Sequence, residues 1–291
     1  MKKLFLALLF SGSFSCFSQA RYSGFIDKYP IELVAESTAS SSEGVYMYKK
    51  FDIPIFLSGK LENGTFTFTE KDSDGKEAAT MTFKNVADSG LKEGIWKDLK
   101  TGKEFKITLA KEFEFQDGND IAWKNEEILQ TASTKDYYFK LVAEKRKEDY
   151  YPQIGAIRIY AKKTDALIQE LEFSGQFRGI NSIGIDDYNF DGIQDFSVFE
   201  SSYAGPNTSS IYYLFDAKTK KYSESGFAGI SLSFDPSTKT ISEHNQCCAG
   251  RIVTEATYKL KNNKMVLIEE HCFVYDEKKG ELVERKMKDC H

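Results

Sequence analysis

Hydrophobic and polar residues alternate with a period of two along most of this chain. Six segments show the alternation most clearly: GTFTFTE, EFKITLA, IRIYA, SIYYLF, ISLSF and IVTEATYKL. Because successive side chains of a β-strand point to opposite faces of a sheet, this pattern predicts half-buried strands. Only the short segment KNEEILQTA suggests a helical period. An aromatic content of 14% and only five prolines agree with an all-β fold.

The same pattern divides the chain into two β parts. Residues 21–113 contain short strands and tight turns, among them the Asn63-Gly64 and Asp74-Gly75 pairs that are typical of hairpins. This predicts a small N-terminal β-barrel or sandwich. Residues 114–136 lose the alternation, which predicts a connector. Residues 137–291 repeat a hairpin with a lysine-containing turn, which predicts a C-terminal β-meander, either propeller-like or a sandwich.

The first twenty residues have the features of a secretory signal peptide. Two lysines precede an apolar segment from Leu4 to Phe10, and small residues then lead to a predicted cut before Arg21. This predicts an exported protein of the periplasm or cell surface. No later segment reaches the ~20 apolar residues of a membrane-spanning helix. A lipid-modified Cys16 is the less favoured alternative, because the residue three before it is serine and not aliphatic.

The charge balance narrows the class of partner. The formal net charge is −5. Loss of the signal peptide would make it −7, because that segment holds two lysines and no acid. An acidic surface argues against nucleic acid, whose phosphates need a basic face. It is compatible with a basic protein partner attracted over long range.

The segment DYNFDGIQD, residues 187–195, has the spacing of a calcium loop. Acids and an amide stand at positions one, three, five and nine, with a glycine at six where a sharp turn is needed. Oxygen ligands without histidine or cysteine favour calcium over zinc or copper. The predicted ligands are the side chains of Asp187, Asn189, Asp191 and Asp195 and the main-chain carbonyl of Ile193. A solvated acidic turn without metal is the alternative.

This loop departs from the EF-hand. Its twelfth position is Val198 where an EF-hand has a bidentate glutamate, and its flanks are strand-like. It therefore resembles the nine-residue calcium loops of FG-GAP repeats, which join two strands in β-propellers. A second acidic segment, EKDSDGKEA, has Ala78 at the ninth position, which favours a plain hairpin turn.

No pattern in the chain predicts an enzyme. The sequence lacks a GxSxG nucleophile context, an HExxH motif and a glycine-rich phosphate loop. The carboxylates of the acidic loop are too crowded to flank a glycoside as a catalytic pair does. His244, His271 and His291 are expected to be core, surface or tail residues.

The cysteines predict disulfides near the C-terminus. Once Cys16 leaves with the signal peptide, an even number remains in an exported chain, which favours two bridges. A bond between neighbours in sequence would be strained, so each cysteine is expected to pair with a distant one. A zinc site with His244 and His271 is the alternative. The four disulfide candidates are Cys247, Cys248, Cys272 and Cys290.

The C-terminal half resembles a group of exported bacterial proteins. The resemblance is carried, in order, by IRIYAKKTDALIQELEF, DDYNFDGIQDFSVFE, SSYAGPNTSSIYYLFDAKTKKY, LSFDPSTKTIS and CCAGRIVTEATYKLKNNKMVLIEE. Characterised members are calcium-binding immunity proteins that inhibit lysozyme-like peptidoglycan hydrolase toxins delivered by secretion systems. The resemblance implies the same fold and activity here. The segments RYSGFIDKYPIELV and LKEGIWKDLKTGKEFKITL resemble a small β module of exported proteins whose activity is unknown.

An inhibitor of this kind needs a segment that enters the hydrolase cleft. The best match is the loop SSYAGPNTSS, residues 201–210, which follows the strand after the acidic loop. Tyr203 is expected to be the anchor, with Ser202 or Asn207 hydrogen bonding to catalytic acids. An ordinary hairpin turn is the alternative reading of this loop. The alternative function is an envelope or surface module that binds glycan or protein without inhibiting an enzyme.

Overall fold

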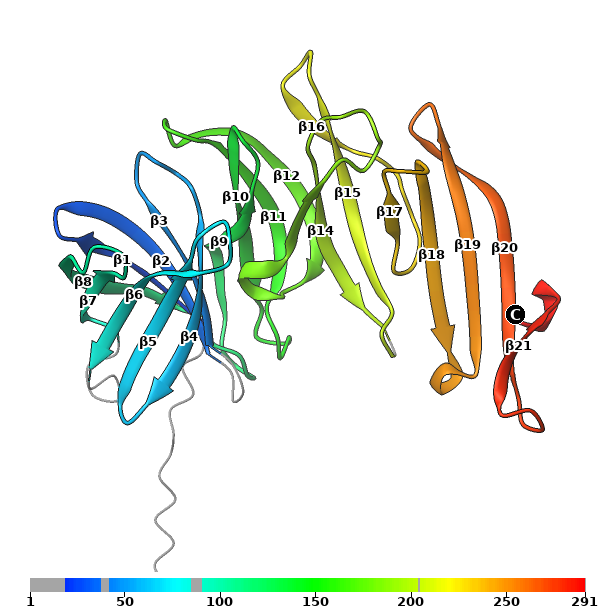
Figure 1. Ribbon diagram of the computed structural model, residues 1–291, viewed down its shortest axis with the longest axis horizontal. Coiled ribbons are helices and arrows are strands. Elements are labelled where there is room, and N and C mark those ends of the chain that lie inside the picture. Colours follow the sequence, from blue (N-terminus) through cyan, green and yellow to red (C-terminus); the bar gives the residue numbers. More distant parts are fainter. Residues whose placement is uncertain (1–18, 38–41, 85–90, 204, 291) are drawn as a thin grey trace, which may run out of the picture.

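The computed structural model describes residues 19–37, 42–84, 91–203 and 205–290 (Figure 1). The described chain is all-β, as the sequence predicts, and its helices are short 3-10 turns: η1 Gly179–Asn181, η2 Cys248–Gly250 and η3 Met287–Asp289. Within these residues no helix is long and apolar enough to cross a membrane. Cys16 and all but the last two residues of the predicted signal peptide lie outside the described residues.

The N-terminal part is a closed antiparallel barrel. Each strand pairs with the next, and the last pairs with the first. Inward side chains such as Leu33, Phe68 and Phe83 are fully buried and form the barrel's own core. The predicted hairpin turn at Asn63 and Gly64 has φ angles of 50° and 75°, as its turn type requires. The strands are β1 Ala20–Ile26, β2 Tyr29–Ser37, β3 Ser42–Tyr48, β4 Ile55–Glu62, β5 Thr65–Lys71, β6 Glu77–Lys84, β7 Glu93–Asp98 and β8 Glu104–Glu114.

Three antiparallel sheets follow the barrel in chain order, side by side in Figure 1. Each is a meander of sequential strands, in agreement with the predicted hairpins. The first sheet is β9 Trp123–Ser133, β10 Tyr137–Lys145, β11 Gln153–Ala161 and β12 Ala166–Gln176. The second is β13 Ile183–Asp186, β14 Asp195–Ser202, β15 Thr208–Asp216 and β16 Lys221–Glu224. The third is β17 Ser233–Asp235, β18 Thr240–Cys247, β19 Ile252–Lys261, β20 Lys264–Asp276 and β21 Glu281–Arg285.

Strand β9 corrects the predicted connector over residues 114–136. It is eleven residues long and pairs with β10 as an integral strand of the first sheet. Its consecutive residues Ile128, Leu129 and Gln130 are all fully buried. In a strand that is covered on both faces, hydrophobic and polar residues do not alternate, so the alternation pattern does not reveal this strand.

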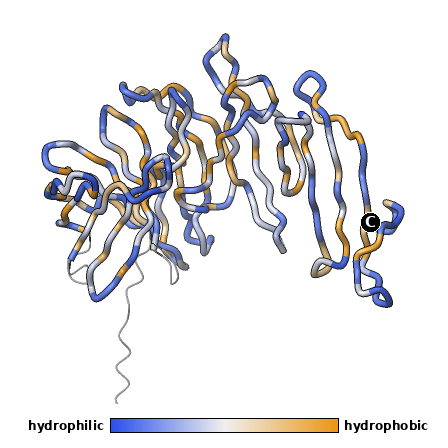
Figure 2. The backbone as a smooth tube through the Cα atoms, viewed as in Figure 1, coloured by the Kyte–Doolittle hydropathy of each residue, from blue (hydrophilic) through white to orange (hydrophobic). Residues whose placement is uncertain are grey.

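One hydrophobic core joins the barrel to the first and second sheets. This core contains Val34, Val45 and Met47 from the barrel together with buried residues of the first and second sheets. An aromatic group lies at its centre, where the Phe196 ring stacks 4.7 Å from the Tyr213 ring. A smaller cluster joins the second sheet to the third. Figure 2 shows how hydrophobic and hydrophilic residues alternate along the strands.

The barrel begins before the predicted cut at Arg21. Ala20 is 3% exposed and pairs with Ala35 and Glu114, and the Gln19 carbonyl accepts the Phe115 N–H at 2.8 Å. We expect a chain without residues 1–18 to be more stable than one without residues 1–20, by about 1–2 kcal/mol for the lost main-chain hydrogen bonds. Urea unfolding of the two chains checks this, and equal midpoints would contradict it.

The cysteines pair differently from the prediction. Cys272 on β20 is bonded to Cys290, which follows η3, so one bridge is confirmed. The expectation that Cys247 and Cys248 each pair with a distant cysteine is wrong, because both are free and exposed. The β20–β21 hairpin brings the C-terminal segment back onto β20, where Cys290 meets Cys272. Cys247 and Cys248 are left without a distant partner.

Candidate metal centre and binding loop

The acidic loop joins β13 to β14 and is held by its aromatic residues. Tyr188 is buried between the second and third sheets, with its ring 4.9 Å from Tyr212 and 4.8 Å from Phe234. Phe190 packs at the edge of the same cluster. These two rings anchor the turn in the apolar cluster, while Asp191 is exposed and Asp187 and Asn189 are half-buried.

Main-chain N–H groups of the loop gather around its carboxylates. The Asp191 N–H donates to Asp187 Oδ1 at 2.9 Å, and the Gly192 N–H donates to Asp187 Oδ2 at 2.7 Å. The Ile193 N–H donates to Asp191 Oδ1 at 2.9 Å, and the Asn189 amide donates to Asp191 Oδ2 at 3.0 Å. Gly192 has φ 88°, which explains the glycine at position six. Asp187, Asn189 and Asp191 are therefore brought together as predicted.

Asp195 has a different role from its neighbours. It is fully buried, and its oxygens accept the N–H groups of Tyr188 at 3.1 Å and Phe215 at 2.8 Å. Burial raises the pKa of Asp195 to about 6, against the lowering effect of the Phe215 N–H, and the nearby charge of Asp191 raises it further. This carboxylate ties the acidic loop to β15.

The donor set of the loop suits a hard cation. Among the described residues, no three side chains of the types His, Cys, Asp and Glu lie close enough together to hold a metal ion. The cysteines therefore form no such group with His244 and His271. The oxygens close together are those of Asp187, Asn189 and Asp191, with the Ile193 carbonyl next in the chain. The ninth residue of such a loop often reaches calcium through a water, which is compatible with the hydrogen bonds of Asp195. The three predicted carboxylates do not converge as one group, and calcium at Asp187, Asn189 and Asp191 stays a prediction.

The predicted binding loop lies between β14 and β15. The Tyr203 N–H donates to the Asn207 carbonyl at 3.0 Å and closes a tight turn. The Tyr203 side chain is 49% exposed, and its hydroxyl lies 3.3 Å from Ser209 Oγ. Ser202 is also exposed, while its N–H donates to Gln176 Oε1 at 3.1 Å. An aromatic side chain is thus presented to solvent from a turn that is attached at its base.

Asn207 does not have the role predicted for it. It is buried, and its amide nitrogen donates to Asn245 Oδ1 and to the Gln246 carbonyl, both at 2.8 Å. Its Oδ1 accepts the Gln246 N–H at 3.1 Å. Because the whole amide is bound to β18, no part of it is left for a partner. Asn207 instead fastens the loop to the third sheet.

The two loops lie at opposite ends of β14. Asp195 is the first residue of this strand and Ser202 is the last. Eight residues of extended chain span roughly 26 Å. A cation in the acidic loop is therefore too far away to touch a partner bound at Tyr203, and it can act only by stabilising the strand.

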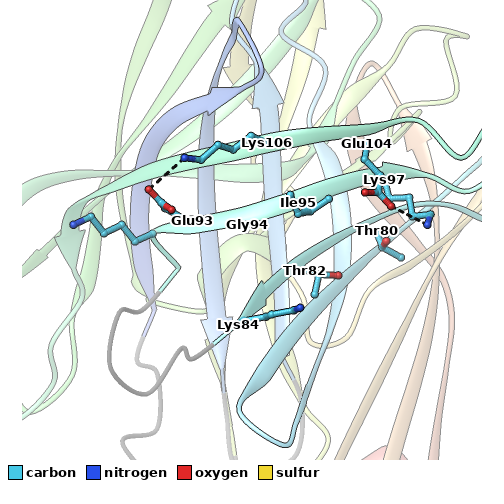
Figure 3. Close-up of a pocket in the computed structure, with 10 residues that line it drawn as sticks. Thr80, Thr82, Lys84, Glu93, Gly94, Ile95, Lys97, Glu104 and Lys106 are labelled. Atoms are coloured by element: carbon cyan, nitrogen blue, oxygen red, sulfur yellow. Dashed lines mark hydrogen bonds and ion pairs between the residues drawn. The ribbon is translucent and has the colours of Figure 1, made fainter.

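A groove on the outside of the barrel was not predicted from the sequence. It runs over β6, β7 and β8 and encloses about 930 Å³ (Figure 3). Ile95 is 43% exposed at its floor, and ion pairs join Lys97 to Glu104 and Lys106 to Glu93 at its sides. Its cations come from separate strands, so no cluster is visible in the sequence. The charged residues of the groove are Lys84, Lys92, Lys97, Lys106, Glu93 and Glu104.

A cleft of about 610 Å³ at the junction of the barrel and the first sheet contains a perturbed carboxyl. Glu36 accepts the Ile180 N–H at 2.6 Å and a hydrogen bond from the Gln19 amide. Burial raises the pKa of Glu36 to about 7, the Ile180 N–H opposes the shift, and the charge of Glu43 adds to it. The carboxyl therefore retains its proton in the folded protein at pH values where it is ionised in the unfolded chain.

We expect Glu36→Gln to stabilise the protein above pH 7. The pKa of Glu36 is raised from 4.5 to about 7 by folding, so its stabilising contribution is complete below pH 4.5 and is lost as the pH rises through 7. The neutral amide of the variant avoids that loss. We expect its free energy of unfolding to exceed that of the wild type by on the order of 1–2 kcal/mol above pH 7, and to differ little from it at pH 4.5. Unfolding curves over this pH range check the prediction. A constant difference between variant and wild type would contradict it.

Comparison with known proteins adds little to these observations. No family model matches the chain, and no curated protein matches it. Four solved chains match by structure. One is described as a Xanthomonas type IV secretion system related protein, with 20% identity and a TM-score of 0.37 over 58% of this chain and 98% of that chain. A likeness at this level carries no argument about function.

Proposed function

We propose that this protein is an exported calcium-binding inhibitor, or immunity protein, that blocks a lysozyme-like peptidoglycan hydrolase. In this proposal the loop 201–210 enters the cleft of the enzyme and Tyr203 is the anchor. The observation that carries it is the exposed Tyr203 side chain on a turn fastened to β18 by Asn207. A rigid scaffold that presents one aromatic side chain is the arrangement expected of an interface hot spot.

The chemistry of the loop is compatible with a hydrolase cleft. Glycoside hydrolases of this kind use two carboxyl groups, which accept hydrogen bonds when ionised. Tyr203 and Ser202 each carry a hydroxyl that can donate to such an acid. The net charge of −5 favours encounter with a basic enzyme. No residue of this chain is assigned a catalytic role.

Calcium has a structural role in this proposal. When bound, it would supply positive charge to the carboxylates of Asp187 and Asp191. The chain's own contribution is the buried Asp195, which holds the acidic loop to β15 through Phe215 and so fixes β14. The strand in turn positions Tyr203 at its far end.

A lysis-protection assay tests the proposed function. The protein is added to cell walls with each of a panel of lysozyme-like enzymes, including any that is encoded beside its gene. We expect the wild-type protein to prevent lysis by at least one of them in proportion to its concentration. Lysis at the same rate by every enzyme, with the protein in excess, would refute inhibition.

The groove on the barrel supports a second candidate function, that of an envelope module binding an acidic glycan. Lysine side chains outnumber acids there, and Thr80 and Thr82 add hydroxyl groups. We expect an acidic polysaccharide to bind more weakly as salt rises, and the Lys84→Ala, Lys92→Ala double variant to lose several-fold in affinity. Equal binding by the double variant and the wild type would exclude this groove.

A further inference from the structure

The turn at the end of β18 brings two free thiols together. Cys247 ends the strand, Cys248 begins η2, and their Sγ atoms lie 3.0 Å apart at an exposed position. Cys248 and Ala249 both have φ 56°, a left-handed conformation that is strained for residues with a Cβ. The turn with this backbone conformation places the two sulfur atoms side by side.

We propose that Cys247 and Cys248 form a redox modification site, a vicinal dithiol that closes to a disulfide by exchange with a low-molecular-weight or protein disulfide. A disulfide bond is about 2.05 Å long, so the sulfur atoms have to approach by only about 1 Å. Both residues are exposed, so an oxidant can reach them. The other described cysteines, Cys272 and Cys290, are already bonded to each other.

The exchange proceeds in two balanced steps. The hydrogen bond between the two thiols raises the pKa of Cys247. The Cys248 thiolate attacks one sulfur of the oxidant R–S–S–R, forms a mixed disulfide and releases one RS⁻. Cys247 then loses its proton and attacks Cys248 Sγ, which closes the ring and releases the second RS⁻. Two thiols are oxidised, one external disulfide is reduced, and both protons pass to the released thiolates or to solvent.

The closed form should be easy to reopen. Neighbouring Cα atoms are about 3.8 Å apart, which is below the usual 4.4–6.8 Å span of a disulfide. Strained and exposed disulfides are the more readily reduced ones. Cys272, in contrast, is fully buried, so its bond to Cys290 is protected from reductant. The two pairs therefore differ in both strain and access.

The site lies beside the loop 201–210. Gln246, which Asn207 holds through both its main-chain groups, immediately precedes Cys247. Closing the ring changes the backbone at Cys247, and we expect this to alter the hydrogen bonds between Asn207 and Gln246. Hydrogen exchange at the Gln246 N–H should then differ at least severalfold between the open and closed forms. An unchanged rate would overturn this coupling.

Mass spectrometry tests the proposal independently of any inhibitory activity. The mature protein is mildly reduced, incubated with oxidised glutathione and mapped by peptides. We expect the peptide with residues 247–248 to lose the mass of two hydrogen atoms, while the Cys272–Cys290 bond is unchanged. A wild-type protein that retains glutathione, forms linked dimers or keeps two free thiols would overturn the proposal.

Two controls sharpen the test. In Cys247→Ser the resolving thiol is missing, so glutathione should stay attached to Cys248. A titration with dithiothreitol should reopen the Cys247–Cys248 bond at a reductant concentration at least tenfold below that needed for Cys272–Cys290. Reduction of the two bonds at the same concentration would contradict the labile character of the site.

Discussion

Calcium at a hundredfold excess over its Kd is expected to raise the free energy of unfolding by about 2.7 kcal/mol. The reason is that the loop gathers Asp187, Asn189 and Asp191 only in the folded chain, so the cation binds that state alone. Asp191→Ala should remove most of this gain, because it deletes the carboxylate that accepts the Ile193 N–H and faces Asn189. Thermal melts with calcium and with chelator measure the effect.

The hairpin turn between β5 and β6 provides a matched control. Asp72 there accepts the N–H groups of Asp74 and Lys76, both at 2.9 Å, but the acid at the ninth position is missing. Asp74→Ala should therefore leave the calcium effect at its wild-type size. Coincident wild-type melts with calcium and with chelator would rule out the metal site. A loss of the effect in Asp74→Ala would move the site to the barrel.

Much of the fold could be predicted because its strands are half-buried hairpins. Alternation marks such strands, and turns like Asn63-Gly64 mark their ends. Strand β9 could not be found in this way, since Ile128 to Gln130 are covered on both faces. Its burial depends on the barrel packing against the first sheet, and no local pattern encodes that contact.

The site was predictable where the chemistry is local. Asp187, Asn189 and Asp191 belong to one turn, and their spacing alone brings them together. The role of Asn207 depends on β18, which is far away in sequence, although an asparagine in a turn commonly binds main-chain groups. The cysteine pairing likewise depended on which strand lies beside the C-terminal segment.

Tyr203→Ala is expected to weaken binding to the target hydrolase about thirtyfold or more. A buried aromatic anchor at the centre of an interface typically contributes ~2 kcal/mol or more. The side chain is 49% exposed in the free protein, and among the described residues its polar contact is the 3.3 Å approach of its hydroxyl to Ser209 Oγ. Its removal should therefore leave the melting temperature nearly unchanged. Binding kinetics should show the loss mainly as faster dissociation.

Tyr150→Ala is the matched control for this substitution. Tyr150 is 54% exposed and lies on a different connection, between β10 and β11, so its loss should not affect binding. Raising the salt concentration should slow association equally for both variants, because the net charge is the same in each. The loss of affinity in Tyr203→Ala measures the contribution of the anchor, and the effect of salt on association measures the electrostatic attraction. Wild-type affinity in Tyr203→Ala would refute the anchor. An equal loss in Tyr150→Ala would place the interface elsewhere on the surface.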